Sequence, residues 1–127
     1  MKVIKNSFIP WGYADYINLF GVIFTKRDNI KLSKQVINHE SIHTLQMKYL
    51  LYIPFYILYV IEWLFKIPVA MFINQSKYGL LQYAYRSISF EQMAYYNDKN
   101  YDYLETANPY EWIKYIFKMY EIDRRNS

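Results

Sequence analysis

The chain has 127 residues, and 54% of them are hydrophobic, which is enough apolar mass for one core in a single domain spanning residues 1–127. It contains no cysteine, so disulfides, thiolate zinc sites and cysteine nucleophiles are excluded. The formal net charge of +4 is too small to indicate a nucleic-acid partner, and we expect none. Aromatic residues reach 21%, including sixteen tyrosines, so we expect many rings to line a surface, a groove or a membrane interface.

The short apolar stretch at the N-terminus ends at Pro10-Trp11-Gly12 without a small-residue cleavage site, so we expect no signal peptide. The most apolar part of the chain is Leu50–Ile73, and its uninterrupted portion is short for a membrane span. A span over this whole stretch would place Glu62 near the bilayer centre, which is costly. We therefore expect a buried or interfacial helix with peripheral membrane contact, in the cytoplasm or on the cytoplasmic face of a membrane.

The N-terminal part of the chain has a strand-like composition. Residues 3–9 and 16–25 are rich in Ile, Val, Phe and Tyr, and Ile17–Phe24 resembles one strand. The two stretches are predicted to pair as a small antiparallel element, followed by a polar turn at Lys26–Asn29. Ser33 predicts the N-cap of a long helix, because neither Gly nor Pro interrupts the residues that follow until Pro54.

The middle of the chain predicts a second helix. Pro54 either kinks the first helix or lies at the start of the next. The second helix is predicted over residues 55–65, with Pro68 disturbing its end. Residues 74–79 are polar and are expected to form a loop.

Two further helices are predicted toward the C-terminus. One starts at Ser87 or Ser89 and continues to about Asp98, since Ser89 and Gln92 match a capping box. The other starts at Asn108, with Pro in its first position and Glu in its third. Its apolar side is predicted to carry Trp112, Ile113, Ile116, Phe117 and Tyr120. The predicted fold class is mainly α (α+β), a compact helical domain with a small N-terminal antiparallel β element.

Both histidines of the chain lie in His39-Glu40-Ser41-Ile42-His43, an H-E-x-x-H pattern inside the first predicted helix. Residues four apart lie on one helix face, so His39 and His43 can bind one Zn²⁺. Glu40 is rotated by one position and flanks the metal instead of binding it. There it can take a proton from a zinc-bound water, whose pKa falls to about 7, and return it to a leaving amine. The pattern therefore predicts a zinc hydrolase with Glu40 as the catalytic residue.

A catalytic zinc usually has a third protein ligand, and without another His or Cys this ligand must be a carboxylate. Glu62 is the only acid in an apolar stretch, although an ion pair with Lys66 explains it equally well. Glu91 lies near a predicted helix start, where acids are also common for electrostatic reasons. Two histidines and a carboxylate also suit iron or manganese, so the residues leave the third ligand and the metal open.

The H-E-x-x-H pattern with a downstream Glu resembles the gluzincin metallopeptidases. Membrane-linked members of the HtpX type carry their third ligand in Glu-x-x-Ala-Asp, and Glu91-Gln92-Met93-Ala94 matches the first four positions. Tyr95 stands where the Asp would be, so the support that this Asp gives to a zinc-binding histidine is unassigned. The resemblance implies one Zn²⁺ per chain, held by His39, His43 and Glu91.

The chain is also similar, over most of its length, to a group of small bacterial H-E-x-x-H proteins with no known substrate. Residues 38–46, 55–63 and 84–91 carry this similarity. Together the resemblances imply a compact zincin-like fold and a metallopeptidase acting on a peptide or protein. Glu62 is then expected to support the site or to be the alternative ligand.

The resemblance to zincins also implies how a substrate is bound. Leu19–Phe24 is expected to pair with a peptide as a sheet edge, unless this strand merely packs on the zinc helix. Gln46 lies one turn beyond His43 and is expected either to hydrogen-bond near the site or to be solvated. Candidates for stabilising the oxyanion are Tyr85, Arg86 and Tyr95.

Two alternatives stay open. One is a non-catalytic, membrane-associated or partner-binding helical protein, with a structural metal or none, whose working surface is residues 49–65. The other is a peptidase whose C-terminal helix covers its own cleft. The sequence leaves the oligomeric state open.

Overall fold

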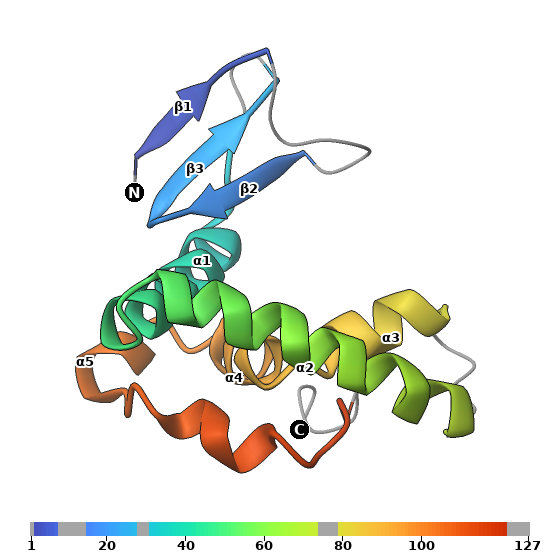
Figure 1. Cartoon of the computed structure of the whole chain (residues 1–127). Coiled ribbons are helices and arrows are strands. Elements are labelled where there is room, and N and C mark those ends of the chain that lie inside the picture. Colours follow the sequence, from blue (N-terminus) through green and yellow to red (C-terminus); the bar gives the residue numbers. More distant parts are fainter. Residues whose placement is uncertain (1, 8–14, 28–30, 74–78, 122–127) are drawn as a thin grey trace.

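The computed structural model describes residues 2–7, 15–27, 31–73 and 79–121, and it places a small sheet against a helical body (Figure 1). The strands are β1 (Val3–Lys5), β2 (Tyr16–Leu19) and β3 (Val22–Thr25). The helices are α1 (Lys34–Tyr49), α2 (Ile53–Phe72), α3 (Leu80–Arg86), α4 (Ser89–Asn97), α5 (Tyr103–Thr106) and the 3-10 helix η1 (Glu111–Tyr115). This arrangement confirms the predicted class, mainly α with a small N-terminal β element.

The sheet has the strand order β1-β3-β2, and its topology differs from the prediction. The expected single strand over residues 17–24 is instead an antiparallel hairpin of β2 and β3. Phe20 and Gly21 take φ of 55° and 85°, and two successive positive φ values give the tight turn that hairpins favour. Because β2 occupies one edge of β3, β1 pairs with the other edge, and it runs parallel instead of antiparallel. Of the predicted stretch 3–9, the last two residues lie outside the described part.

Helix α1 begins as predicted. Ser33 is its N-cap, and the Ser33 hydroxyl accepts a hydrogen bond from the backbone N–H of Val36 at 3.1 Å. The sheet is attached to the middle of this helix through Asn18 of β2. Its amide donates to the backbone carbonyl of Glu40 at 3.1 Å and to the Thr44 hydroxyl at 3.3 Å. This contact places β2 directly beside the H-E-x-x-H turn of α1.

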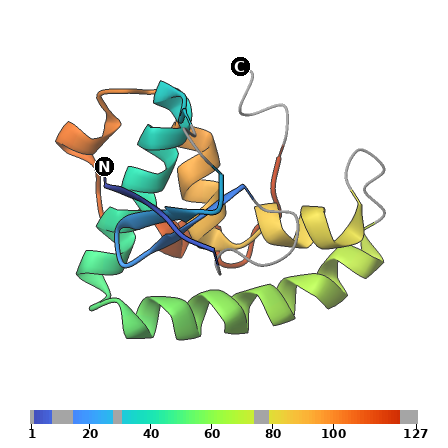
Figure 2. The ribbon, with the colours of Figure 1, turned by 90° about the horizontal axis from the view of Figure 1, so that it is seen from above.

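Helix α2 starts at Ile53 with Pro54 in its first turn, as one of the two predicted alternatives has it. The expectation that Pro68 disturbs its end is wrong, since the helix continues to Phe72. Beyond the proline, Ala70 packs against Tyr83 of α3, and this burial offsets the lost backbone hydrogen bond. Seen from above, α2 runs along one side of the molecule with α3 beside its C-terminal half (Figure 2).

Helix α4 is the central helix, because Ser89 to Ala94 are all buried. The capping box predicted for it is wrong. Ser89 donates both its backbone N–H and its hydroxyl to the Glu62 carboxylate of α2. Gln92 turns inward instead and donates to the carbonyls of Ser87, Tyr115 and Lys118. A side chain from α2 therefore holds the start of α4.

The long C-terminal helix predicted from Asn108 is also wrong. Asn108 accepts a hydrogen bond from the backbone N–H of Tyr110 in a local turn, and η1 is the one helix in the described residues that follow, up to residue 121. The side chains of Lys66 and Gln92 donate to the carbonyls of Tyr115 and Lys118, so α2 and α4 hold the segment that contains residues 115–118. Its expected apolar side is therefore split, with Tyr120 buried and Ile113 and Phe117 exposed, the latter by 98%.

Two short helices differ from the prediction, and two predicted connecting segments are only partly described. Helices α3 and α5 were not predicted at all. The polar turn at Lys26–Asn29 is described only for its first two residues. Of the loop 74–79, only Gly79 is described, as the N-cap of α3.

We predict that Gly21→Ala lowers the free energy of unfolding by about 1–2 kcal/mol. Its positive φ disfavours a side chain, and an added Cβ would lie 3.0 Å from the Thr44 methyl group on α1. Gly79→Ala is the control, because nothing lies within 4 Å of its added Cβ and its φ is −62°. Urea unfolding compares the two variants. Equal stabilities would contradict the tight contact between the hairpin and α1.

Candidate metal centre

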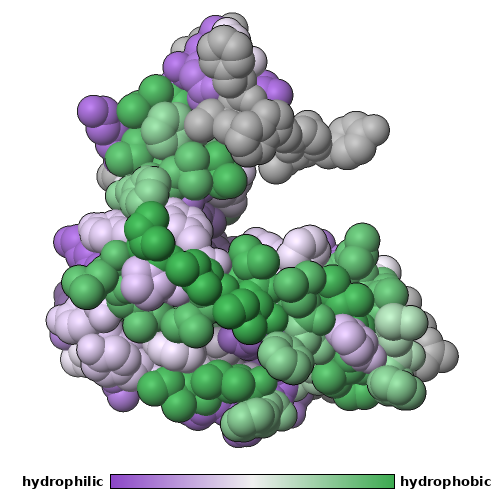
Figure 3. Space-filling view, viewed as in Figure 1, coloured by the Kyte–Doolittle hydropathy of each residue, from purple (hydrophilic) through white to green (hydrophobic). Residues whose placement is uncertain are grey.

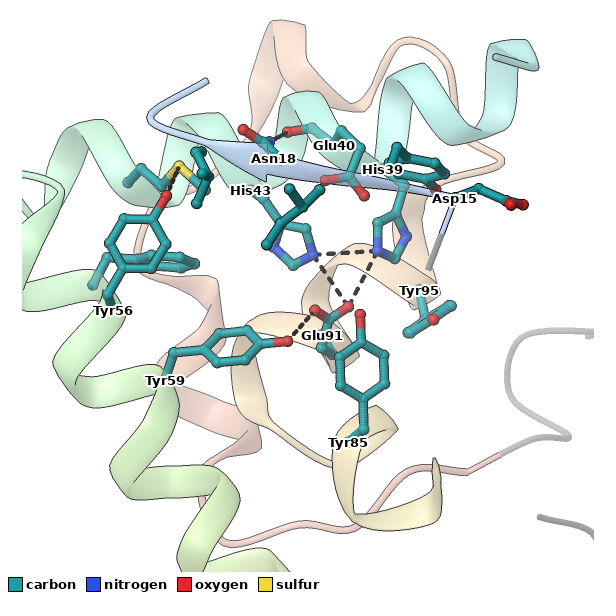
Figure 4. A pocket seen from close by; sticks show the side chains of 15 residues that line it. Asp15, Asn18, His39, Glu40, His43, Tyr56, Tyr59, Tyr85, Glu91 and Tyr95 are labelled. Carbon is teal, nitrogen blue, oxygen red and sulfur yellow. Dashed lines mark hydrogen bonds and ion pairs between the residues drawn. The ribbon is translucent and has the colours of Figure 1, made fainter. Parts of the chain in front are cut away.

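His39, His43 and Glu91 come together at one point between α1 and α4 (Figure 4). The Nε2 atoms of His39 and His43 lie 3.2 Å and 3.1 Å from the same carboxylate oxygen, Oε1 of Glu91. The two Nε2 atoms are 3.2 Å apart. The potential ligand atoms of the three residues all lie within 4.8 Å of one another, which is the arrangement that a tetrahedral cation requires.

Local structure explains this convergence. The two histidines are one turn apart on the face of α1 that packs against α4. Glu91 lies in the first turn of α4, whose start is held by Glu62. Glu62 itself does not join the cluster, and its carboxylate lies 3.8 Å from the Lys66 ammonium, as the ion-pair interpretation predicted. Its contribution is to fix the backbone that carries Glu91.

The other ring nitrogen of each histidine has a partner. His39 Nδ1 lies 3.0 Å from Oδ2 of Asp98, and His43 Nδ1 lies 2.8 Å from Oε1 of Gln46. These two acceptors favour a proton on each Nδ1 and turn each Nε2 toward Glu91. Gln46 thus makes the predicted hydrogen bond near the site. It is fully buried, so the solvated interpretation is wrong.

Asp98 is a supporting residue that the sequence pattern missed. The family pattern places this acid four residues after the third ligand, where this chain has Tyr95. Asp98 lies one turn further, seven residues after Glu91, and therefore on the same side of the helix. This seven-residue spacing from Glu91 is the feature of the sequence that could have identified Asp98. Tyr95 instead packs its ring edgewise against His39, with 4.5 Å between ring centroids.

Tyr59 of α2 is a second residue that the sequence did not single out. Its hydroxyl donates to Oε2 of Glu91 at 2.6 Å. One oxygen of the carboxylate is thereby held by α2, and the other faces both histidines. Its position could not be read from the sequence, because it depends on how α2 packs across α4.

The charges and hydrogen bonds of the cluster favour protonated histidines beside an ionised Glu91. Burial lowers the pKa of His39, but hydrogen bonds to Asp98 and Glu91 outweigh it and raise the pKa to about 9. Burial also lowers the pKa of His43, and the Glu91 charge outweighs it and raises that pKa. Burial raises the pKa of Glu91, but His43 and His39 hold it well below its usual range. A bound cation would replace the protons that these histidines carry.

Glu40 points into the same space as the cluster without joining it (Figure 4). The space is a cavity of about 500 Å³ bounded by β2, α1, α2, α3 and α4. Tyr16 and Asn18 of β2 form one side, and Phe55 and Tyr56 of α2 form another. The pKa of the Tyr16 hydroxyl is raised to about 12 by burial and by the negative charge of Glu40. The cluster therefore lies beside an open volume with an acid next to it.

The fold places some of the other predicted site residues beside the cavity and others away from it. Tyr85 and Tyr95 line the cavity, whereas Arg86 does not line it and lies over the Tyr95 ring at 4.4 Å. Of the expected strand Leu19–Phe24, only Leu19 lines the cavity, and the strand beside the cavity is β2, to which Leu19 belongs. Among the described residues, none after Tyr95 lines the cavity, so the described C-terminal segment does not cover it.

Comparisons with protein-family models, with curated proteins and with solved structures give no match to this chain. The resemblance to gluzincin peptidases stays a prediction based on residues 39–43 and 91–94. A function for this protein is therefore inferred from the chemistry of the site.

We predict that Asp98→Asn weakens zinc binding about 10- to 100-fold, because the partner of His39 loses its charge. Asp102→Asn is the matched control, since that residue is exposed and its side chain caps no helix. Competition with a chromogenic chelator measures both affinities. An unchanged affinity in Asp98→Asn would show that Asp98 does not orient a metal ligand.

Proposed function

We propose that this protein is a zinc-dependent metallopeptidase in which His39, His43 and Glu91 hold one zinc ion. The observation that carries the proposal is the convergence of both Nε2 atoms on one oxygen of Glu91 beside a cavity of about 500 Å³. Structural zinc sites are closed by four protein ligands, whereas catalytic sites have three and leave a position open. Three ligand residues next to an open cavity match the second kind.

The proposed chemistry is hydrolysis of a carbonyl compound. Zinc, when bound, acts as a Lewis acid that makes water nucleophilic at neutral pH. Glu40 accepts a proton from the attacking water and passes it to the leaving amine. The hydroxyls of Tyr85 and Tyr95 are the candidates for donating to the developing oxyanion, since both residues line the cavity.

A peptide or protein is the proposed substrate. β2 is an outer strand of the sheet and pairs with β3 alone among the described strands, and it borders the cavity. An extended peptide added to this edge would run past Glu40 and the cluster. This supports β2 as the substrate strand, in place of Leu19–Phe24. The proposed location is the cytoplasm or the cytoplasmic face of a membrane.

The non-catalytic alternative is favoured by one observation, the large exposed apolar surface of α2. It requires no activity and no open metal position. The two experiments below separate it from the peptidase.

We expect about one zinc per chain in protein purified without added metal, and loss of that zinc in His43→Ala and Glu91→Ala. Glu105→Ala is the matched control, because Glu105 is an exposed acid on α5 outside the cluster and the zinc should be retained. Mass spectrometry of the metal content of the purified protein measures the zinc per chain and identifies iron or manganese if either is bound. A wild-type protein that takes up no metal, even when zinc is offered, would refute the proposal.

We expect Glu40→Gln to bind zinc normally but to hydrolyse a peptide library at least about 100-fold more slowly, because the general base is lost. Glu105→Gln, an exposed substitution on α5, serves as the control and should keep full activity. Activity is followed by mass spectrometry of the cleaved peptides. Full activity in Glu40→Gln would exclude this residue as the base.

A further inference from the structure

The outer face of α2 is a large apolar surface that the described chain leaves uncovered. Among the described residues, α2 is the one helix long and apolar enough to cross a membrane, and only 17% of its most apolar window is buried. Its two charged residues, Glu62 and Lys66, turn inward toward Ser89 and the C-terminal segment. The exposed face therefore carries no charge, unlike the outward face of a helix in a soluble protein.

The C-terminal segment widens this face. Residues 112–119 lie next to α2, and together they form a largely apolar groove of about 430 Å³. Glu62 and Lys66 also line it, but their side chains are mostly buried and lie 3.8 Å apart as an ion pair. Phe65 of α2 and Phe117 line the groove and are 72% and 98% exposed. Figure 3 shows hydrophobic side chains gathered over α2 and over the chain below it on one side of the molecule. We call the exposed apolar side chains of this surface the apolar face: Ile53, Ile57, Leu58, Val60, Ile61, Leu64, Phe65, Val69, Met71 and Phe72 of α2, with Ile113 and Phe117.

Basic and aromatic residues flank the apolar face. Lys48 lies in the last turn of α1, shortly before α2 in the chain, and Lys114 and Lys118 belong to the C-terminal segment. All three are exposed. Tyr49 and Tyr110 are about half exposed, and their rings meet edge to face at 5.9 Å. Lysines attract anionic headgroups, and tyrosines prefer the boundary between headgroups and acyl chains.

We propose that the apolar face docks on the surface of an anionic lipid bilayer, with α2 lying in the membrane plane. A charge-free apolar face with lysines at its margin has the chemistry of an interfacial helix. Crossing the bilayer is disfavoured, because the opposite side of α2 carries Tyr59 and Glu62, which hydrogen-bond to α4. A spanning α2 would have to lose these contacts or take polar groups of α4 into lipid.

The individual side chains also favour lipid over a second copy of this chain. The most exposed large apolar side chains are Leu51 before α2, Phe72 at its end and Phe117 beside it, at 78%, 91% and 98%. A protein partner would need a matching hollow for each of these separate protrusions, whereas acyl chains accommodate them without a fixed shape.

Docking by this face leaves the metal cavity free. The residues of α2 that line the cavity are Phe55, Tyr56 and Tyr59, and none of them lines the apolar groove. The docking proposal is therefore independent of the proposed peptidase function, and either can fail alone.

The test is co-sedimentation of the purified protein with phosphatidylcholine vesicles, with and without phosphatidylserine. We expect binding to vesicles that contain phosphatidylserine and at least about tenfold weaker binding for the double variant Phe65→Ser/Phe117→Ser. Both positions are exposed, so the fold and the zinc content should be unchanged. Ile37→Ser, an exposed apolar substitution on α1, is the matched control and should bind like the wild type.

Two further measurements fix the orientation. Lys48→Gln/Lys118→Gln should weaken binding to anionic vesicles but not to neutral ones. Brominated acyl chains should quench the fluorescence of Trp112, which lines the groove. Absence of vesicle binding, or a dimer in analytical ultracentrifugation that Phe65→Ser/Phe117→Ser abolishes, would overturn the proposal. So would a protein that only detergent, and not high salt or alkaline carbonate, releases from membranes.

Discussion

The structure depends on a carboxylate buried between two helices. Glu91 is 2% exposed, and an isolated charge at that depth would be strongly unfavourable. Two imidazoles from α1 and one hydroxyl from α2 compensate it, so three helices meet at a single side chain. The same contacts that make its burial tolerable also bring the imidazoles close enough to share a cation. Both the packing of these helices and the proposed chemistry therefore depend on one cluster.

Helix α2 links this cluster to the outside of the molecule. Its inner side supplies Tyr59 to Glu91 and Glu62 to the start of α4, so it fixes both the ligand and the helix that carries it. Its outer side is apolar and uncharged. Glu62 lies on the inner side of the helix beneath this apolar surface. Its carboxylate accepts hydrogen bonds from Ser89 and forms an ion pair with Lys66. A helix long and apolar enough to cross a membrane thus supports the candidate site from one side.

Errors in the predicted fold share a cause. The prediction of one strand where the structure has a β hairpin fails because local composition suits either. The prediction of a long helix where the C-terminal segment forms a short 3-10 helix and turns fails for the same reason. Phe20 takes a positive φ in the turn of the hairpin, and the conformational propensity of Phe does not predict this. The carbonyls of Tyr115 and Lys118 are taken by side chains from α2 and α4, which lie far away in sequence. Local propensity cannot anticipate partners that only packing supplies.

The sequence by itself determined the N-capped helix α1, the placement of both histidines on one face of it and Glu40 beside them, because these depend on helical spacing alone. It narrowed the third ligand to two acids. The tertiary structure places only one of them beside the histidines, since the packing of α4 on α1 brings Glu91 to them and leaves Glu62 at Ser89. It also decided the partners Asp98 and Tyr59, which come from other helices. Distances between elements are set by burial of the whole core, and no local pattern encodes them.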